Sequence, residues 1–135
     1  MEISKIIKQL DLPFPLRDYQ WQGVEFLTNN SRALLADEMG LGKTVQVAVS
    51  LEIINKKNTM LRSLVIVPSS LKYNWENEIN LWAPSLSVRR ISGGAMNRWA
   101  AFRSPVNVVI ASYNDIRIEM SEGSLDELFD IVVLD

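Results

Sequence analysis

The sequence predicts an α/β fold in which a parallel β-sheet carries helices on both faces. Short apolar runs alternate along the chain with stretches of helical periodicity, which is the order that a parallel sheet requires. The run at 63–67 is nearly all apolar, as expected for a parallel strand covered on both faces. A glycine-rich segment at 37–44 lies between an apolar run and a helical stretch, which is the context of a phosphate-binding loop.

The first 15 residues are expected to form a short helix or a strap ahead of the domain, which occupies residues 16–135. Apolar residues at helical spacing predict an amphipathic helix over 3–10, and the two prolines that follow force an extended segment. A second helix is expected over 17–27, with Tyr19 and Phe26 on its buried side.

Five strands follow from the apolar runs, and they are expected at 32–36, 63–67, 87–91, 107–111 and 131–134. A helix after residue 44 is expected to end near Lys56 and Lys57, whose charges suit the negative end of its dipole. A capping box at 124–127 predicts one further helical turn.

The segment after the second strand predicts a helix that ends before Pro84. The hydroxyl groups of Ser69 and Ser70 are expected to cap it. Its apolar residues fall on one stripe, namely Leu71, Trp75, Ile79 and Trp82. Another short helix is predicted from the turn at Gly93 and Gly94 through Trp99 and Phe102.

The composition excludes several kinds of chemistry. The chain has 135 residues, of which 47% are apolar and 22% charged, so it can form one domain with a core. It has no cysteine and no histidine, which excludes disulfide frameworks, zinc sites made of these residues and histidine-based triads. Fourteen basic against 16 acidic side chains give a net charge of −2, so any DNA contact must be local.

The chain start lacks the uninterrupted apolar core of a signal peptide, and no run approaches membrane-spanning length. We therefore expect an intracellular protein, without contact to a membrane. It would be cytoplasmic in a prokaryote and nuclear in a eukaryote.

The segment at 37–44 carries the chemistry of a polyphosphate site. Its glycines let the backbone approach phosphates, and the following helix points its N-terminus at them. Lys43 supplies the positive charge, and Thr44 places a hydroxyl group where Mg²⁺ would bind. Asp37 stands where the general pattern has its first glycine. The alternative is a glycine-rich turn that merely caps a helix.

Asp135 follows the last apolar run. An acidic residue at the end of such a strand delivers a second magnesium-binding carboxylate to the edge of a nucleotide-binding sheet. Taken alone the pattern is weak, because many buried strands end on Asp through a turn. Combined with the loop, it indicates a metal site shared by Thr44 and Asp135.

Several separate blocks together resemble the Swi/Snf-like ATPases of helicase superfamily two. Residues 16–24 resemble the glutamine motif of that family, and residues 37–44 resemble its motif I, including the Asp at the first position. Residues 67–71 and the helix after them are similar to motif Ia, 110–114 to motif Ib and 132–135 to the opening of motif II. The chain departs from the family at Ala111, where a hydroxyl residue is usual, and at Asn114, where an acid is usual.

The resemblance implies a P-loop, RecA-like lobe that binds ATP and Mg²⁺. The residues implied to contact ATP are Arg17, Gln20, Asp37, Glu38, Met39, Gly40, Leu41, Gly42, Lys43 and Thr44. Gln20 offers a donor and an acceptor together, which suits the adenine edge, although it could also be a solvated helix residue. Lys43 and Asp135 would serve catalysis, and Thr44 and Asp135 would bind the metal.

The resemblance also implies contacts to duplex DNA. The residues concerned are Pro68, Ser69, Ser70, Lys72, Ser112 and Tyr113. A helix N-terminus with hydroxyl groups and a lysine can hold a DNA phosphate, but helix capping alone would produce the same residues. We interpret Trp75, Trp82 and Trp99 as core residues and not as platforms for base stacking.

The expected function is that of an ATP-binding part of a DNA-stimulated ATPase that translocates on double-stranded DNA and remodels chromatin or other nucleoprotein. Relatives of this kind need an acid after the motif II Asp and arginines from a second RecA-like lobe, and neither lies in these 135 residues. The chain therefore looks like a truncated lobe that is inactive alone. In such lobes a later strand lies between the loop strand and the motif II strand, so we expect an incomplete sheet, marginal stability or self-association. The alternatives are a non-catalytic nucleotide-binding or interaction module and an unrelated P-loop kinase.

Overall fold

The computed structural model describes residues 33–35, 43–57, 61–120 and 128–135. The predicted helices over 3–10 and 17–27, the loop at 37–42 and the capping box at 124–127 lie outside the described residues. The elements in chain order are β1 (Ala33–Leu35), α3 (Lys43–Lys57), β2 (Ser63–Val67), the 3₁₀ turn η1 (Ser69–Leu71), α4 (Lys72–Trp82), β3 (Val88–Arg90), α5 (Ala95–Phe102), β4 (Val108–Ser112), α6 (Tyr113–Met120) and β5 (Ile131–Leu134). All five predicted strands are present.

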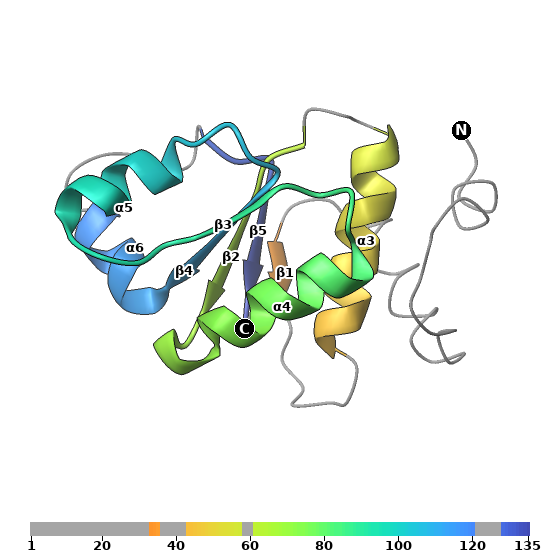
Figure 1. Cartoon of the computed structure of the whole chain (residues 1–135), viewed down its shortest axis with the longest axis horizontal. Helices are drawn as coiled ribbons and strands as arrows, with labels where there is room; N and C mark the ends of the chain where they lie inside the picture. The colour runs from red at the N-terminus through yellow and green to blue at the C-terminus, as the bar shows by residue number, and fades with distance from the viewer. Residues whose placement is uncertain (1–32, 36–42, 58–60, 121–127) are drawn as a thin grey trace.

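The five strands form one parallel sheet in the order β1-β5-β2-β4-β3. β2 lies at its centre, and its five residues are all buried, as the apolar run predicts. All carboxyl ends meet at one edge of the sheet, the lower edge in Figure 1. We call this the carboxyl edge and the opposite one the amino edge.

β1 pairs directly with β5, with Leu35 opposite Leu134. No strand lies between these two in the described sheet, and the sheet nevertheless has no gap there, because β1 pairs with β5 itself. An open edge on β5 would leave backbone N–H and C=O groups without partners, which costs free energy wherever water cannot reach them. β1 satisfies these groups.

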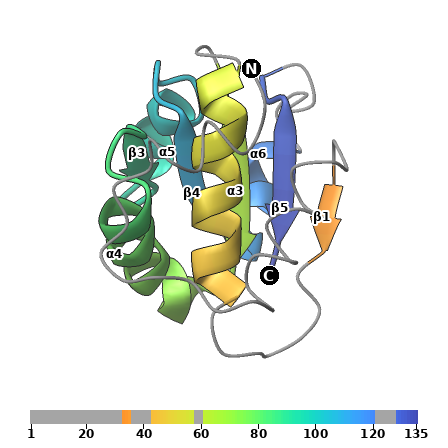
Figure 2. The ribbon, with the colours of Figure 1, turned by 90° about the vertical axis from the view of Figure 1, so that its right-hand side faces the viewer.

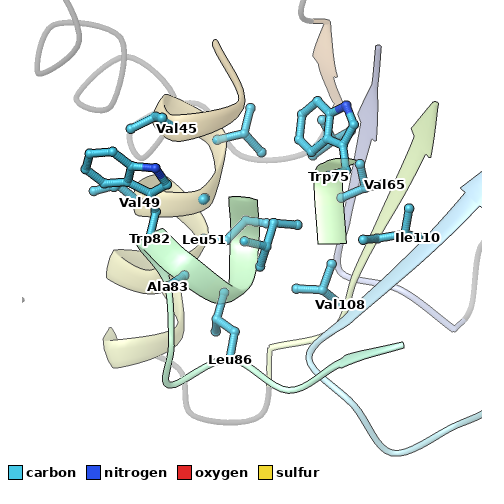
Figure 3. Packing of buried hydrophobic residues seen from close by; sticks show 14 of the residues in the cluster. Val45, Val49, Leu51, Val65, Trp75, Trp82, Ala83, Leu86, Val108 and Ile110 are labelled. Carbon is cyan, nitrogen blue, oxygen red and sulfur yellow. The ribbon is translucent and has the colours of Figure 1, made fainter. Parts of the chain in front are cut away.

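Helices cover both faces of the sheet, as predicted (Figures 1 and 2). On one face, α3 and α4 pack on alternate residues of the strands, such as Val65 and Ile110. On the other face, α5 and α6 cover the intervening residues, such as Ile66 and Val109. Figure 3 shows the first of these cores, in which Trp82 of α4 lies beside Val49 of α3.

α4 confirms most of the predicted apolar stripe. Trp75, Ile79 and Trp82 are buried. Leu71 is 36% exposed, so its assignment to the stripe is wrong. The reason is that Leu71 belongs to η1, whose tighter winding turns its side chain away from the face that α4 buries.

Trp99 is 55% exposed, so the prediction that it belongs to the core is also wrong. The buried residues of α5 are Ala101 and Phe102, the last two residues of this short helix. The guanidinium group of Arg103 lies 4.5 Å from the centre of the Trp99 ring, and a cation–π contact of this kind suits a half-exposed aromatic side chain.

The amino edge is held by polar contacts around Arg62, the residue before β2. Its guanidinium group donates hydrogen bonds to the carbonyl groups of Phe102, Ser104, Val106 and Leu128, at 3.1, 2.7, 3.5 and 2.8 Å. Its backbone N–H donates to the Asp130 carboxylate at 3.0 Å. One side chain thus ties together the segments that lead into β2, β4 and β5.

Asn107 makes a second set of contacts at the same edge. Its side-chain nitrogen Nδ2 donates a hydrogen bond to the carbonyl group of Leu61 at 3.0 Å, and its side-chain oxygen Oδ1 accepts one from the backbone N–H of Ser87 at 3.1 Å. The start of β4 is thereby joined to the segments before β2 and β3.

Candidate functional site

The carboxyl edge gathers the described site residues that the sequence predicts. α3 begins there with Lys43 and Thr44, and Asp135 directly follows β5. Residues 68–70 follow β2, and β4 ends there at Ser112. Ligands bind at this edge in open α/β sheets, so the fold places the predicted residues where chemistry is expected.

The N-terminus of α3 suits a phosphate group. Its first turn leaves backbone N–H groups without partners inside the helix, and it contains no acidic residue that would repel an anion. Thr44, the second residue of the helix, is half-buried. Arg17, Gln20 and residues 37–42 lie outside the described residues, so their contacts to ATP stay predictions.

Asp135 hydrogen-bonds to Ile66, Trp75 and Tyr113. Its backbone N–H donates to the carbonyl group of Ile66 at 2.9 Å, which extends the ladder between β5 and β2. Its carboxylate oxygen Oδ2 accepts the indole N–H of Trp75 at 3.0 Å. Its main-chain oxygen accepts the hydroxyl group of Tyr113 at 2.6 Å. The carboxylate at this edge therefore has a fixed place.

The turn that contains Ser69 and Ser70 is exposed at the same edge, together with Pro68. Neither η1 nor α4 has a side-chain hydrogen bond at its N-cap. The prediction that these serine hydroxyl groups cap the helix is therefore wrong, because the chain enters α4 through a 3₁₀ turn. An exposed turn with two hydroxyl groups is instead suited to a phosphate of a DNA strand.

Lys72 is held inside the protein at this edge. Its ammonium group lies 3.2 Å from a carboxylate oxygen of Asp115 and 2.8 Å from the carbonyl oxygen of Ile91. The two charged side chains are only 16% and 14% exposed. This geometry gives the Lys72 side chain a structural partner in α6, while its backbone N–H donates to the carbonyl group of Ser69.

Ser112 and Tyr113 differ from each other in exposure. Ser112 is buried, and it forms a reciprocal cap with Asp115, in which each backbone N–H donates to the other side chain at 2.9 and 3.1 Å. Tyr113 is 47% exposed and reaches Asp135. Of this pair, Tyr113 is the residue that a DNA strand could contact.

Sequence reasoning missed helix α6 and the role of Asp115. The signal was present, because Ser112 and Asp115 have the spacing of a capping box. It also missed the hydrogen bond from Trp75 to Asp135. Helical periodicity predicts that Trp75 lies on the buried face of its helix, but not which acceptor its indole N–H contacts.

The donors at the carboxyl edge fit a magnesium–nucleotide complex. The described residues contain no group of three or more acidic side chains that could hold a metal alone. Mg²⁺ bound with a nucleotide needs only one or two protein oxygen ligands, because phosphates and water supply the others. Thr44 and Asp135 provide such oxygen atoms.

None of the helices among the described residues is long and apolar enough to span a membrane.

Comparison with known proteins identifies the family. The family model for the SNF2-related domain matches residues 19–135. An uncharacterized ATP-dependent helicase of Mycoplasma pneumoniae is 38% identical over 111 residues, which are 78% of this chain and 11% of that protein. The ATP-dependent helicase BRM of Arabidopsis thaliana is 36% identical over 81% of this chain and 5% of its own length. The chain thus spans a small part of these relatives.

A solved structure shows the same fold. The SWI2/SNF2 ATPase core of Sulfolobus solfataricus, determined in complex with double-stranded DNA, matches 93% of this chain and 32% of its own, with a TM-score of 0.65 and 22% identity. The family match, the relatives and this fold all point to the kind of ATPase that the motif at 37–44 and the site residues at the carboxyl edge indicate. The chain belongs to the SNF2-related family, and its fold is that of the SWI2/SNF2 ATPase core.

Proposed function

We propose that the protein containing this chain is a DNA-stimulated ATPase that translocates on double-stranded DNA, and that this chain forms part of its ATP site. The observation that carries the proposal is the meeting of the α3 N-terminus and Asp135 at one sheet edge. The relatives are named ATP-dependent helicases, and the solved neighbour was bound to double-stranded DNA, which supports both ligands. An unrelated P-loop kinase is disfavoured by the family.

The residues of the edge divide the work. Lys43 would neutralise the outer phosphates, and Thr44 and Asp135 would hold Mg²⁺. When bound, Mg²⁺ stabilises the negative charge that develops on the phosphate oxygens in the transition state. The exposed turn at Ser69 and Ser70, with Tyr113 nearby in the fold, would hold a DNA strand by its phosphates. Hydrolysis further requires a water-orienting acid and arginines, which a second lobe would help to supply. ATP and duplex DNA as ligands imply that the protein acts inside the cell.

The test uses the intact protein. We expect duplex DNA to stimulate ATP hydrolysis, and Lys43→Ala to lower the stimulated rate about 100-fold or more, because a charge that stabilises the transferred phosphoryl group is lost. Lys57→Ala is the matched control, since Lys57 is an exposed lysine at the other end of α3.

Hydrolysis that ignores duplex DNA, or that Lys43→Ala leaves unchanged, would disprove the proposal. Nucleotide binding without any turnover would instead favour a non-catalytic module.

A further inference from the structure

The indole ring of Trp75 joins the ATP side of the carboxyl edge to the DNA side. Trp75 is 1% exposed, and its Nε1–H donates to Oδ2 of Asp135 at 3.0 Å. Figure 3 shows the ring beside Val65 of β2, within the core between α4 and the sheet. The residue is therefore a core residue on one side and a hydrogen-bond donor on the other.

The N–H of an indole is a rigid donor. Its hydrogen cannot rotate, and the ring of Trp75 is fixed by the surrounding core. A carboxylate that accepts such a hydrogen bond is turned to match it. Contacts of this kind, one step removed from a metal, orient the ligand and tune its affinity.

The same helix carries the exposed turn. η1 with Ser69 and Ser70 continues directly into α4, and Trp75 is the fourth residue of α4. A shift of α4 as a unit, caused by a DNA strand bound at the turn, would therefore move the indole N–H together with its surrounding helix relative to Asp135.

A second connection closes a ring around the edge. Lys72 of α4 pairs with Asp115 of α6 at 3.2 Å. Tyr113, the first residue of α6, donates its hydroxyl group to the main-chain oxygen of Asp135 at 2.6 Å. Asp135 is thus held from α4 and from α6, and these two helices are themselves linked by an ion pair.

We propose that Trp75 is a positioning residue, which orients the Asp135 carboxylate toward the magnesium site and couples that orientation to DNA binding at η1. The inference rests on the proposed function, because it assumes that Asp135 binds the metal. It adds a route by which DNA contact stimulates hydrolysis.

The test compares two indole replacements on one helix in the intact protein. Trp75→Phe keeps an aromatic ring in the core and removes the donor, whereas Trp82→Phe makes the same change seven residues along α4, at a side chain that is 8% exposed. The readouts are the Mg²⁺ concentration that gives half-maximal ATP hydrolysis and the stimulation of hydrolysis by duplex DNA.

We expect Trp75→Phe to raise the half-saturating Mg²⁺ concentration about tenfold and to reduce the stimulation by DNA. ATP-analogue binding without Mg²⁺ should not change, which separates loss of orientation from general damage. Trp82→Phe should leave the Mg²⁺ dependence as in the wild type.

A second replacement keeps the test decisive if Trp75→Phe does not fold. Replacing Trp75 by 3-benzothienylalanine exchanges the N–H for sulfur and retains the shape of the ring. Unchanged Mg²⁺ dependence and DNA stimulation in this protein would overturn the inference, and a shift like that expected for Trp75→Phe would support it.

The two levels of proposal fail differently. If the wild type shows no DNA-stimulated hydrolysis, the proposed function is wrong, while Mg²⁺-dependent binding of the ATP analogue still tests the link between Trp75 and Asp135. If the wild type is stimulated and the Trp75 proteins match it, only the role of Trp75 is wrong.

Discussion

Asp135 receives hydrogen bonds from side chains that lie 22 and 60 positions earlier in the sequence. The sequence predicts the position of the carboxylate, because an apolar strand that ends on an acid places it at the carboxyl edge. Its partners depend on how α4 and α6 pack, and such contacts follow from tertiary structure. The metal-binding role of the Thr44 hydroxyl group is predicted from the motif alone, so a substitution of Thr44 tests it separately.

Thr44→Ala in the intact protein is expected to raise the Mg²⁺ concentration needed for half-maximal ATP hydrolysis about tenfold, because one oxygen ligand is lost. The control is Ser50→Ala, which removes a hydroxyl group of α3 that hydrogen-bonds the carbonyl group of Gln46 at 2.6 Å. Equal Mg²⁺ dependence in the two proteins would argue against a metal-binding role for Thr44.

The exposed serines allow a second prediction about single side chains. Replacement of both Ser69 and Ser70 by Ala is expected to weaken duplex DNA binding by about tenfold, since two hydrogen bonds of roughly 0.5–1.5 kcal/mol each would be lost. The loss should be similar for different DNA sequences, because phosphate contacts do not distinguish bases.

Binding titrations at a fixed salt concentration measure this effect. Asn80→Ala, an exposed polar residue near the other end of α4, is the control and should bind DNA as the wild type does. A loss restricted to one DNA sequence would contradict the assignment of these serines to phosphates.

At the level of helices and strands, the sequence predicts most of the architecture. β2 and β5 have the predicted bounds, because parallel strands covered on both faces are continuous apolar runs, although only β2 is buried at every residue. The incorrect predictions concern single residues and one short helix. Leu71 lies at helical spacing with the stripe of α4, and Trp99 is predicted to lie in the core, but a 3₁₀ turn and a short helix with one buried side expose them. α6 has only eight residues, and it is stabilised by a cap whose partners are Ser112 and Asp115.

The contacts of Arg62 indicate that this side chain joins the segments that lead into β2, β4 and β5. Arg62→Lys is expected to cost about 2 kcal/mol of local stability, because an ammonium group cannot reach the set of carbonyl groups that the planar guanidinium group contacts. Backbone amide exchange in β2 should then become roughly 30-fold faster.

Arg117→Lys supplies the comparison for that measurement. Arg117 is exposed and donates to the side chain of Asn114 at 2.6 Å, so exchange in β2 should stay within about twofold of the wild type. Similar exchange rates in both variants would show that Arg62 does not join these strands.

For the molecule as a whole, the sheet differs from the expected one because β1 pairs with β5 directly. The sequence determines which segments form strands, but neighbours within a sheet depend on which edges compete for pairing. The two cores on opposite faces follow from the alternation of side chains along each strand.

Ligand binding is expected to stabilise the intact protein. A non-hydrolysable ATP analogue with Mg²⁺, at about one hundred times its dissociation constant, should add roughly 2.7 kcal/mol to the free energy of unfolding and raise the melting temperature. Lys43→Ala, or omission of Mg²⁺, should reduce the rise. A rise of equal size in the Lys43→Ala protein would place the nucleotide elsewhere.

The position of the Arg62 and Asn107 contacts has a consequence for variants that lack activity. These contacts lie at the amino edge, so Lys43→Ala at the carboxyl edge leaves them intact. This variant, which is expected to lose ATP hydrolysis, would therefore keep its fold and the exposed turn at Ser69 and Ser70 that is proposed to bind DNA. If the protein translocates on DNA as proposed, this variant would compete in a cell with the active protein for the same DNA, and its effect would be dominant.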